Sequence, residues 1–394
     1  MIEYKEIDNW IEDEFKKLDI SPTDYRKAVD RYMAVGNMLE NKLKDEYDID
    51  SHVYAQGSFM IGTVVRPYGR DKEYDVDLVC ECDLSKDEIN PKDLKKMIGN
   101  ILQEDGVYGK MMSADEGRRT WTINYAEDSN LSFHIDIQPS IPKTDSCYEL
   151  AISTTTKKKH NSNEYVWDNG NPLGFKKWFD KINNESYNNV AKMQANYLFE
   201  NNSFYASVDD IPKQLIITKL QRLVQILKRH RDIRFEKHKY SDDKPSSIII
   251  TVLATMVFDK YGSDLSLLEL IEQFANTIYT NLDLIDRTNE NVTGLFIDMV
   301  DGNFVILNPT VEENLAERWN VNDNHKKQAF YDWITWVLSD FKVISKENAF
   351  MKFEKGGFDD FVRNCSLSDT NVFDNIDTKT VDLLNTPKPW KNNV

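Results

Sequence analysis

Apolar residues recur at helical spacing along several stretches of the chain. A short amphipathic helix is predicted over residues 3–19. Ser21 followed by Pro22 is typical of a helix start, with an N-cap residue and a proline in the first turn, and predicts a long helix that ends near Tyr47. We expect this helix to lie as a spine against a sheet, through a buried face of Tyr25, Val29, Tyr32, Met33 and Leu43.

The second half of the chain is dominated by helical patterns. From about Pro212 onward the apolar stripes are long, which predicts a helical lobe. We therefore expect one domain over residues 1–210 and a second over 211–394, with a polar, poorly patterned tail beyond about Cys365. The further helices are predicted over residues 87–103, 174–182, 213–234, 248–261, 265–282 and 326–341.

Two stretches alternate between polar and apolar residues, as half-buried strands do. The first begins at Glu73 and the second at Leu131. One face of the first carries Asp75, Asp77 and Val79, and its other face carries Tyr74, Val76, Leu78 and Cys80. In the second, Leu131, Phe133, Ile135 and Ile137 face the core, whereas Ser132, His134 and Asp136 face the other way.

Other segments suggest a sheet of mixed strands. Residues 119–125 alternate and are followed by turn residues at 128–130, so they are predicted to form a hairpin with the strand at Leu131. Residues 140–172 are expected to be rich in loops, and the basic run 157–160 is expected to be an exposed loop. The turn at 301–303 joins two short strand-like segments.

The carboxylates are the first sign of chemistry. Asp75 and Asp77 on one strand face repel each other and lose solvation unless a cation joins them. A pair of this kind alone is more often a solvated edge. Asp136 on a second strand and the Gly57-Ser58 turn upstream shift the balance to a metal site, because Mg²⁺ prefers carboxylate and phosphate oxygens.

Composition narrows the class of protein. The 394-residue chain has a formal charge of −17, which opposes binding to a long phosphate backbone. Its four cysteines have no C-x-x-C spacing, which favours buried thiols over disulfides or zinc. We find no signal-peptide pattern and no apolar run long enough to span a bilayer, so we expect a cytoplasmic protein without a membrane partner.

Four motifs resemble one known family. They are Gln56-Gly57-Ser58, the segment from Arg66 to Leu78 with Asp75 and Asp77, Lys244 to Ile250, and Asn308-Pro309 with Asn314; Asp136 completes the set. Together they are similar to the cGAS/DncV-like nucleotidyltransferases (CD-NTases) of the DNA polymerase β-like superfamily. The resemblance spans roughly residues 20–345.

The resemblance implies an α+β fold: a nucleotidyltransferase palm, with a mixed sheet, flanking helices and the spine helix, plus a C-terminal helical lobe that completes the nucleotide cleft. It also implies CBASS anti-phage defence, in which a cyclic nucleotide activates an effector protein. The zinc-binding His and Cys cluster of the animal synthase is missing, and this, with the acidic charge, argues against activation by DNA or RNA.

The resemblance also implies roles for individual residues. Gln56, Gly57 and Ser58 would form the triphosphate-binding turn, and Asp75, Asp77 and Asp136 would be the catalytic, metal-binding triad for two Mg²⁺ ions, for which Mn²⁺ could substitute. Lys228 would grip the triphosphate, with Lys219 or Arg222 as alternatives. Ser247 would lie near the nucleotide.

The predicted function is therefore Mg²⁺-dependent joining of ATP and other NTPs into a cyclic di- or trinucleotide. Two alternatives stay open at this point. The same site could transfer a nucleotide to RNA or to a protein hydroxyl, as toxin–antitoxin enzymes do, or the fold could be a non-catalytic nucleotide sensor. The net charge weighs against RNA, and the intact acidic triad weighs against a sensor, because unpaired carboxylates are costly to bury.

Overall fold

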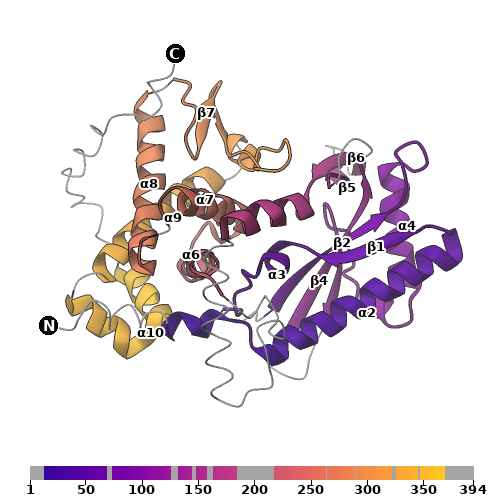
Figure 1. The fold of residues 1–394 in the computed structure, drawn as a ribbon, viewed down its shortest axis with the longest axis horizontal. Coiled ribbons are helices and arrows are strands. Elements are labelled where there is room, and N and C mark those ends of the chain that lie inside the picture. Colours follow the sequence, from indigo (N-terminus) through magenta and orange to yellow (C-terminus); the bar gives the residue numbers. More distant parts are fainter. Residues whose placement is uncertain are drawn as a thin grey trace.

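The computed structural model describes the chain in ten ranges. Within them it forms a sheet-containing lobe and a helical lobe, and a long helix runs along the sheet, which is the α+β architecture predicted (Figure 1). Across the helices of these ranges we find no segment with both the length and the apolar composition of a membrane span. The described residues are 13–68, 73–125, 132–143, 148–157, 163–183, 217–262, 264–288, 290–321, 325–344 and 347–368.

The long helix α2 (Pro22–Tyr47) begins and ends where the sequence predicts. The Ser21 hydroxyl accepts a hydrogen bond from the Asp24 amide at 3.0 Å, which satisfies one of the unpaired amides of the first turn. The helix buries Ala28, Val35, Leu39 and Leu43 against the sheet. Met33 is 51% exposed, so its predicted burial is wrong. It lies two positions before Val35, or about 200° around the helix from the buried stripe.

The sheet follows the order β1-β2-β4-β5-β6, and β3 pairs with residues 133–137 of β4, beside the pairing of β4 with β5. Among the strands that the structure describes, β2 and β4 are parallel neighbours and the other pairings of this sheet are antiparallel. The predicted pairing of β3 with β4 is confirmed, whereas its turn lies outside the described residues. The six strands that the structure describes in this sheet are β1 (Ser51–Ala55), β2 (Glu73–Cys82), β3 (Trp121–Tyr125), β4 (Ser132–Pro142), β5 (Leu150–Lys157) and β6 (Asn163–Gly170).

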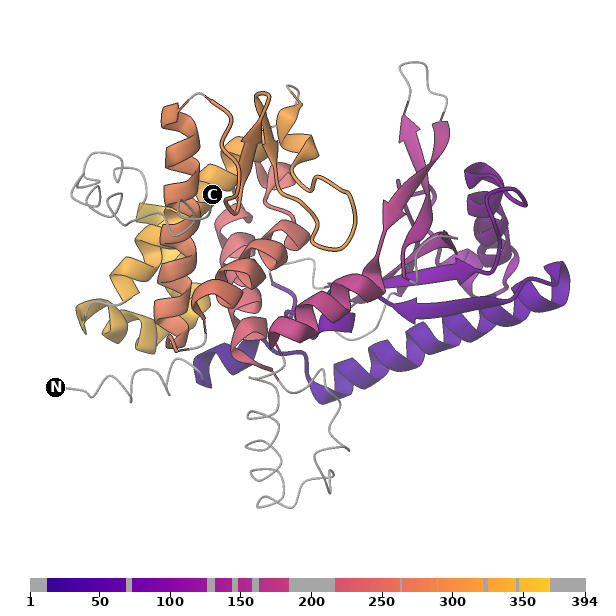
Figure 2. The ribbon, with the colours of Figure 1, turned by 45° about the horizontal axis from the view of Figure 1, so that its top comes forward.

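Strands β5 and β6 correct the expectation of loops over residues 140–172. In β5 the polar residues Ser153 and Thr154 are buried, which hides the usual alternation of apolar and polar residues. β-branched threonine nevertheless favours a strand, because its side chain packs well on a pleated surface. Of the predicted loop at residues 157–160, Lys157 is instead the last residue of β5, and residues 158–160 lie outside the described residues. Residues 172–183 are helical and cross from the sheet to the helical lobe (Figure 2).

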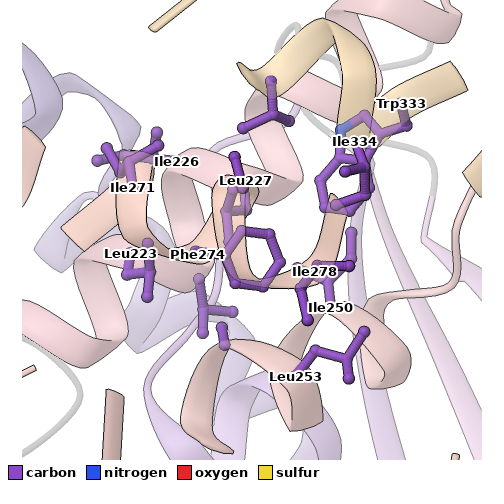
Figure 3. Close-up of a cluster of buried hydrophobic side chains, with 14 of the residues drawn as sticks. Leu223, Ile226, Leu227, Ile250, Leu253, Ile271, Phe274, Ile278, Trp333 and Ile334 are labelled. Carbon is purple, nitrogen blue, oxygen red and sulfur yellow. The ribbon is translucent and has the colours of Figure 1, made fainter. Parts of the chain in front are cut away.

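The helical lobe is built around α6, which is buried on every side. Helices α7, α8 and α9 supply apolar side chains to the same core, of which Figure 3 shows Leu227, Ile250, Phe274 and Trp333. Phe15 and Phe179 from the first half of the chain also pack into this core. The predicted domain boundary at residue 210 lies outside the described residues and stays a prediction. The helices of this lobe are α6 (Lys219–Phe235), α7 (Ser247–Tyr261), α8 (Leu267–Thr288) and α9 (Lys326–Ile344), and the short strands β7 (Asp298–Val300) and β8 (Asn303–Val305) form a hairpin. Helix α4 (Pro91–Glu104) instead packs against the sheet.

A last helix, α10 (Glu347–Ser368), was not predicted. Gly357 has a φ of 73° and breaks it into two parts, so neither part shows a long apolar stripe in the sequence. Phe358, Phe361 and Val362 nevertheless bury against the core of the helical lobe. At the other end of the chain, the predicted first helix is described only from residue 13, as a helical turn followed by the 3₁₀ helix η1 (Lys16–Leu18).

A buried ion cluster joins two helices of this lobe, and we expect Asp340→Asn to destabilise the fold by about 3–5 kcal/mol. The Asp340 carboxylate is 3.0 Å from Nε2 of His230 and accepts hydrogen bonds from Arg234 at 2.5 and 2.9 Å. Burial alone would raise the pKa of Asp340, but the hydrogen bonds and charges of these two partners outweigh it and hold the pKa below its usual range. The variant would remove the negative charge that Asp340 places beside the buried guanidinium of Arg234. Urea unfolding measures the loss.

The pH dependence of unfolding provides a second readout. A depressed carboxyl pKa means that the ionised form stabilises the fold above the unfolded pKa, so this contribution disappears as the pH falls below about 4. Asp332→Asn is the matched control, since Asp332 lies on the same helix and accepts only an exposed hydrogen bond from Gln328 among those found. Equal stability of the Asp340→Asn and Asp332→Asn variants at neutral pH would contradict the stabilising role of the buried ion cluster.

Candidate active site

A cavity of about 1300 Å³ lies between the sheet and the helical lobe. It is lined by residues far apart in the sequence, from β2 and the loop before it on one side and from α6 and α7 on the other. Because both lobes contribute residues, the sequence pattern of a single helix or strand could not predict this cavity. The predicted residues that line the cavity are Gln56, Gly57, Ser58, Asp75, Asp77, Lys228 and Ser247.

The three predicted aspartates come together because β2 and β4 are parallel neighbours. The register pairs Asp77 with Asp136 and Asp75 with His134. Tyr74, Val76 and Leu78 alternate with the β2 carboxylates and are buried on the opposite face. The core therefore fixes which way the carboxylates point.

The charges of these three carboxylates repel one another when no cation lies between them. Burial, followed by repulsion from Asp75 and Asp136, raises the pKa of Asp77 to about 8. Burial and then Asp136 also raise the pKa of Asp75. His134 partly offsets the charge: its hydrogen bond to Asp136 raises the imidazole pKa to about 9. The other favourable charge near the pair is Lys228.

The donor set fits a divalent cation. Ligand atoms of Asp75, His134 and Asp136 all lie within 4.8 Å of one another, and Asp77 adjoins them through its pairing with Asp136. The Thr122 hydroxyl donates a hydrogen bond to Oδ1 of Asp136 and holds that carboxylate in place. Carboxylates crowded on rigid strands, with raised pKa values, are what a divalent ion would relieve.

Gly57 is required at its position for two reasons. Its φ of +60° is one that residues with a side chain rarely adopt, and a Cβ atom there would lie 2.5 Å from Oδ2 of Asp77. The amide of Gln56 donates to the carbonyl oxygen of Asp77 at 2.8 Å, which ties the turn to β2. The short helix α3 (Gly57–Ile61) follows, and Ser58 faces the cavity.

The structure distinguishes between the three candidate basic residues on α6. Lys228 lines the cavity, and its Nζ donates to the carbonyl and hydroxyl oxygens of Thr63 at 3.2 and 3.3 Å. Lys219 instead donates to the Leu265 carbonyl at 2.6 Å, and Arg222 pairs with Asp19 at 2.7 Å. Burial, and then the neighbouring charge of Arg231, lower the pKa of Lys228 to about 8.

Ser247 lies at the first turn of α7 and faces the cavity. Its hydroxyl accepts a hydrogen bond from Nη1 of Arg231 at 3.0 Å. Sequence reasoning missed Arg231, which also lines the cavity, and gave no role to His134, although the strand pattern placed it on the polar face. Asn314, in contrast, is structural: its side chain bonds the backbone of Phe304, Ile306 and Ala316.

Comparison with known proteins agrees with this architecture. Residues 6–183 match the family model of the Second Messenger Oligonucleotide or Dinucleotide Synthetase domain. The chain is 26% identical over 302 residues, 76% of its length and 70% of the relative's, to a c-di-GMP synthase of Roseivirga ehrenbergii. It is 28% identical over 223 residues, 55% of its length and 51% of the relative's, to the cyclic dinucleotide synthase CdnG of Bradyrhizobium diazoefficiens. The solved structure of that CdnG with GTP matches with a TM-score of 0.67 at 20% identity, over 92% of this chain and 98% of the other.

The mixed sheet, the long helix along it and the helical lobe match the fold of that CdnG structure. The matched domain and the two relatives show similarity to cyclic dinucleotide synthases. The chain is thus similar to the CD-NTases in fold and, over residues 6–183, to the second-messenger synthetase domain in sequence.

Proposed function

We propose that this protein joins nucleoside triphosphates into a cyclic dinucleotide, with divalent metal ions held by Asp75, Asp77 and Asp136. The observation that carries the proposal is the convergence of these carboxylates beside a cavity that both lobes line. Two relatives named as cyclic dinucleotide synthases support it. Mg²⁺ is the proposed ion, two per active site, because the donors are mainly carboxylates.

Five of the cavity residues have a task in this reaction. The Gly57-Ser58 turn and Lys228 would bind the triphosphate, and Ser247, oriented by Arg231, would lie near the same nucleotide. When bound, the divalent ions would neutralise the triphosphate and lower the pKa of the acceptor hydroxyl. The residues act mainly by positioning and by compensating charge.

The same displacement reaction occurs twice, first to join two nucleotides and then to close the ring. A ribose hydroxyl loses its proton and attacks the α-phosphorus of the second nucleotide; the new oxygen–phosphorus bond forms as the α–β bond breaks and pyrophosphate leaves. The linear product then presents its own hydroxyl and remaining triphosphate for ring closure. We further propose that the cyclic product activates an effector protein in anti-phage defence, as the family resemblance implies.

Labelled NTPs incubated with the pure protein and Mg²⁺ test this function. We expect a small product that resists phosphatase and is absent in the Asp75→Ala/Asp77→Ala variant. Labelled RNA or protein bands would favour transfer to a macromolecule. No turnover of any NTP, with Mg²⁺ or with Mn²⁺, would favour a nucleotide sensor.

A further inference from the structure

His134 is a chemically active side chain to which the reaction above gives no task. It lies on β4 two residues before Asp136, so both side chains point to the same face of the strand. The parallel register places it beside Asp75 on β2. Its side chain is 32% exposed, which leaves the ring accessible to a small ion.

The distances allow the imidazole and two carboxylates to share one ion. Nε2 of His134 is 3.5 Å from Oδ1 of Asp136, and the ligand atoms of His134, Asp75 and Asp136 all lie within 4.8 Å of one another. Ligand atoms on opposite sides of an ion with bonds of about 2.1 Å are about 4.2 Å apart. Convergence on one ion therefore needs only a small displacement of the side chains.

The surroundings of His134 also match those of a metal ligand. A metal-binding imidazole usually donates its second ring N–H to a carboxylate, which fixes the tautomer and the ring orientation. Here Nδ1 lies 3.8 Å from Oε2 of Glu73, the first residue of β2. Thr122 fixes the Asp136 carboxylate by its hydrogen bond. Asp136 therefore has an outer partner in place, and Glu73 lies close enough to become one for His134 after a small movement of its side chain.

We propose that His134 is a ligand of the divalent ion held by Asp75 and Asp136, and that its imidazole makes this position favour Mn²⁺ over Mg²⁺. The inference rests on the proposed function, since that function places an ion there. Mg²⁺ is bound mainly by oxygen atoms, whereas transition-metal ions also bind imidazole nitrogen. Mn²⁺ shares the preference of Mg²⁺ for carboxylates, so a mixed set of oxygen and nitrogen donors discriminates in its favour.

Electron paramagnetic resonance of the full chain with Mn²⁺ alone tests the ligand directly. Electron spin echo modulation detects a nitrogen atom bonded to Mn²⁺, and the signal of free Mn²⁺ gives the dissociation constant. The variants are His134→Ala and His134→Gln, of which the second keeps a hydrogen-bonding group of similar size. His52→Ala is the control, because His52 lies on strand β1 of the same sheet with its side chain 74% exposed.

We expect nitrogen modulation in the wild type and in His52→Ala, and its loss in both His134 variants. The dissociation constant for Mn²⁺ should rise at least about 10–100-fold in these variants, the range found when even outer partners of metal ligands are removed. The constant for Mg²⁺, measured by competition, should change much less.

Two results would overturn the inference. The first is Mn²⁺ that binds the wild type, and is lost in Asp136→Asn, without nitrogen modulation. The second is an equal loss of Mg²⁺ and Mn²⁺ affinity in the His134 variants. If the wild type still makes a cyclic product in either case, the proposed function stands without this ligand. Nitrogen modulation in a protein that turns over no NTP would support the ligand and contradict the function.

Discussion

Replacing Asp77 with asparagine is expected to lower the rate of nucleotide joining by at least about 10²–10³-fold, the loss typical of removing one preorganised electrostatic group. The side chain keeps its size and loses only its charge. Asp77 lies between Asp75, Asp136 and Gly57, so no other carboxylate can take its place without moving a strand. Initial rates of pyrophosphate release from saturating NTPs measure the effect.

The same substitution should stabilise the metal-free protein, which separates an active-site role from a structural one. The pKa of Asp77 is raised from 3.8 to about 8, so the folded chain binds a proton that the unfolded chain releases between these values. Stability of the wild type in chelator should therefore fall as the pH rises through this window, and less so in the variant. Asp83→Asn, at an exposed site just after β2, is the control and should change neither quantity. A destabilised Asp77→Asn protein would contradict this account.

Gly57→Ala is expected to cause the second large loss of activity, again about 10²-fold or more, since even small displacements at a reacting centre are costly. The added Cβ would meet Oδ2 of Asp77 at 2.5 Å, and the backbone at φ +60° would be strained. The strain should cost about 1–2 kcal/mol of stability. The carboxylate or the turn must move, and both belong to the site. Steady-state kinetics measure the loss of activity, and thermal unfolding measures the loss of stability.

Gly106→Ala is the matched control for this variant. Gly106 has no neighbouring atom within 4 Å of an added Cβ, and no unusual φ is found there. Its variant should retain full activity. A Gly57→Ala enzyme with unchanged rate and unchanged metal affinity would show that the contact between this turn and Asp77 has no catalytic importance.

Much of the site could be predicted because its signals are local. Strand alternation alone placed Asp75, Asp77 and Asp136 on the polar faces of two strands, and the register of β2 and β4 then brings them together. The choice of Lys228 over Lys219 and Arg222 needed tertiary structure. Helix α6 is surrounded on all sides, so its basic residues do not form one exposed face that a sequence pattern could reveal.

The fold was predictable where a helix cap and an apolar stripe occur together in the sequence, as in α2. It was not predictable where one of these signals is missing or interrupted. β5 was missed because its buried residues include serine and threonine, and α10 because Gly357 interrupts its pattern. His134 was seen on the correct face, but no sequence signal showed that Glu73 would lie beside its second nitrogen. That contact depends on the parallel pairing of strands about 60 residues apart, which single-sequence periodicity does not encode.

The ratio of pyrophosphate released to NTP consumed, measured on the pure enzyme with mass analysis of the product, tests the central claim most directly. Synthesis that ends in ring closure releases one pyrophosphate for each NTP consumed, because no triphosphate remains in the product. We predict one pyrophosphate per NTP and a product with the mass of a cyclic dinucleotide. In Asp77→Asn, both the pyrophosphate release and the product should be lost. A product that retains a triphosphate, or label that ends on protein or RNA, would contradict the claim.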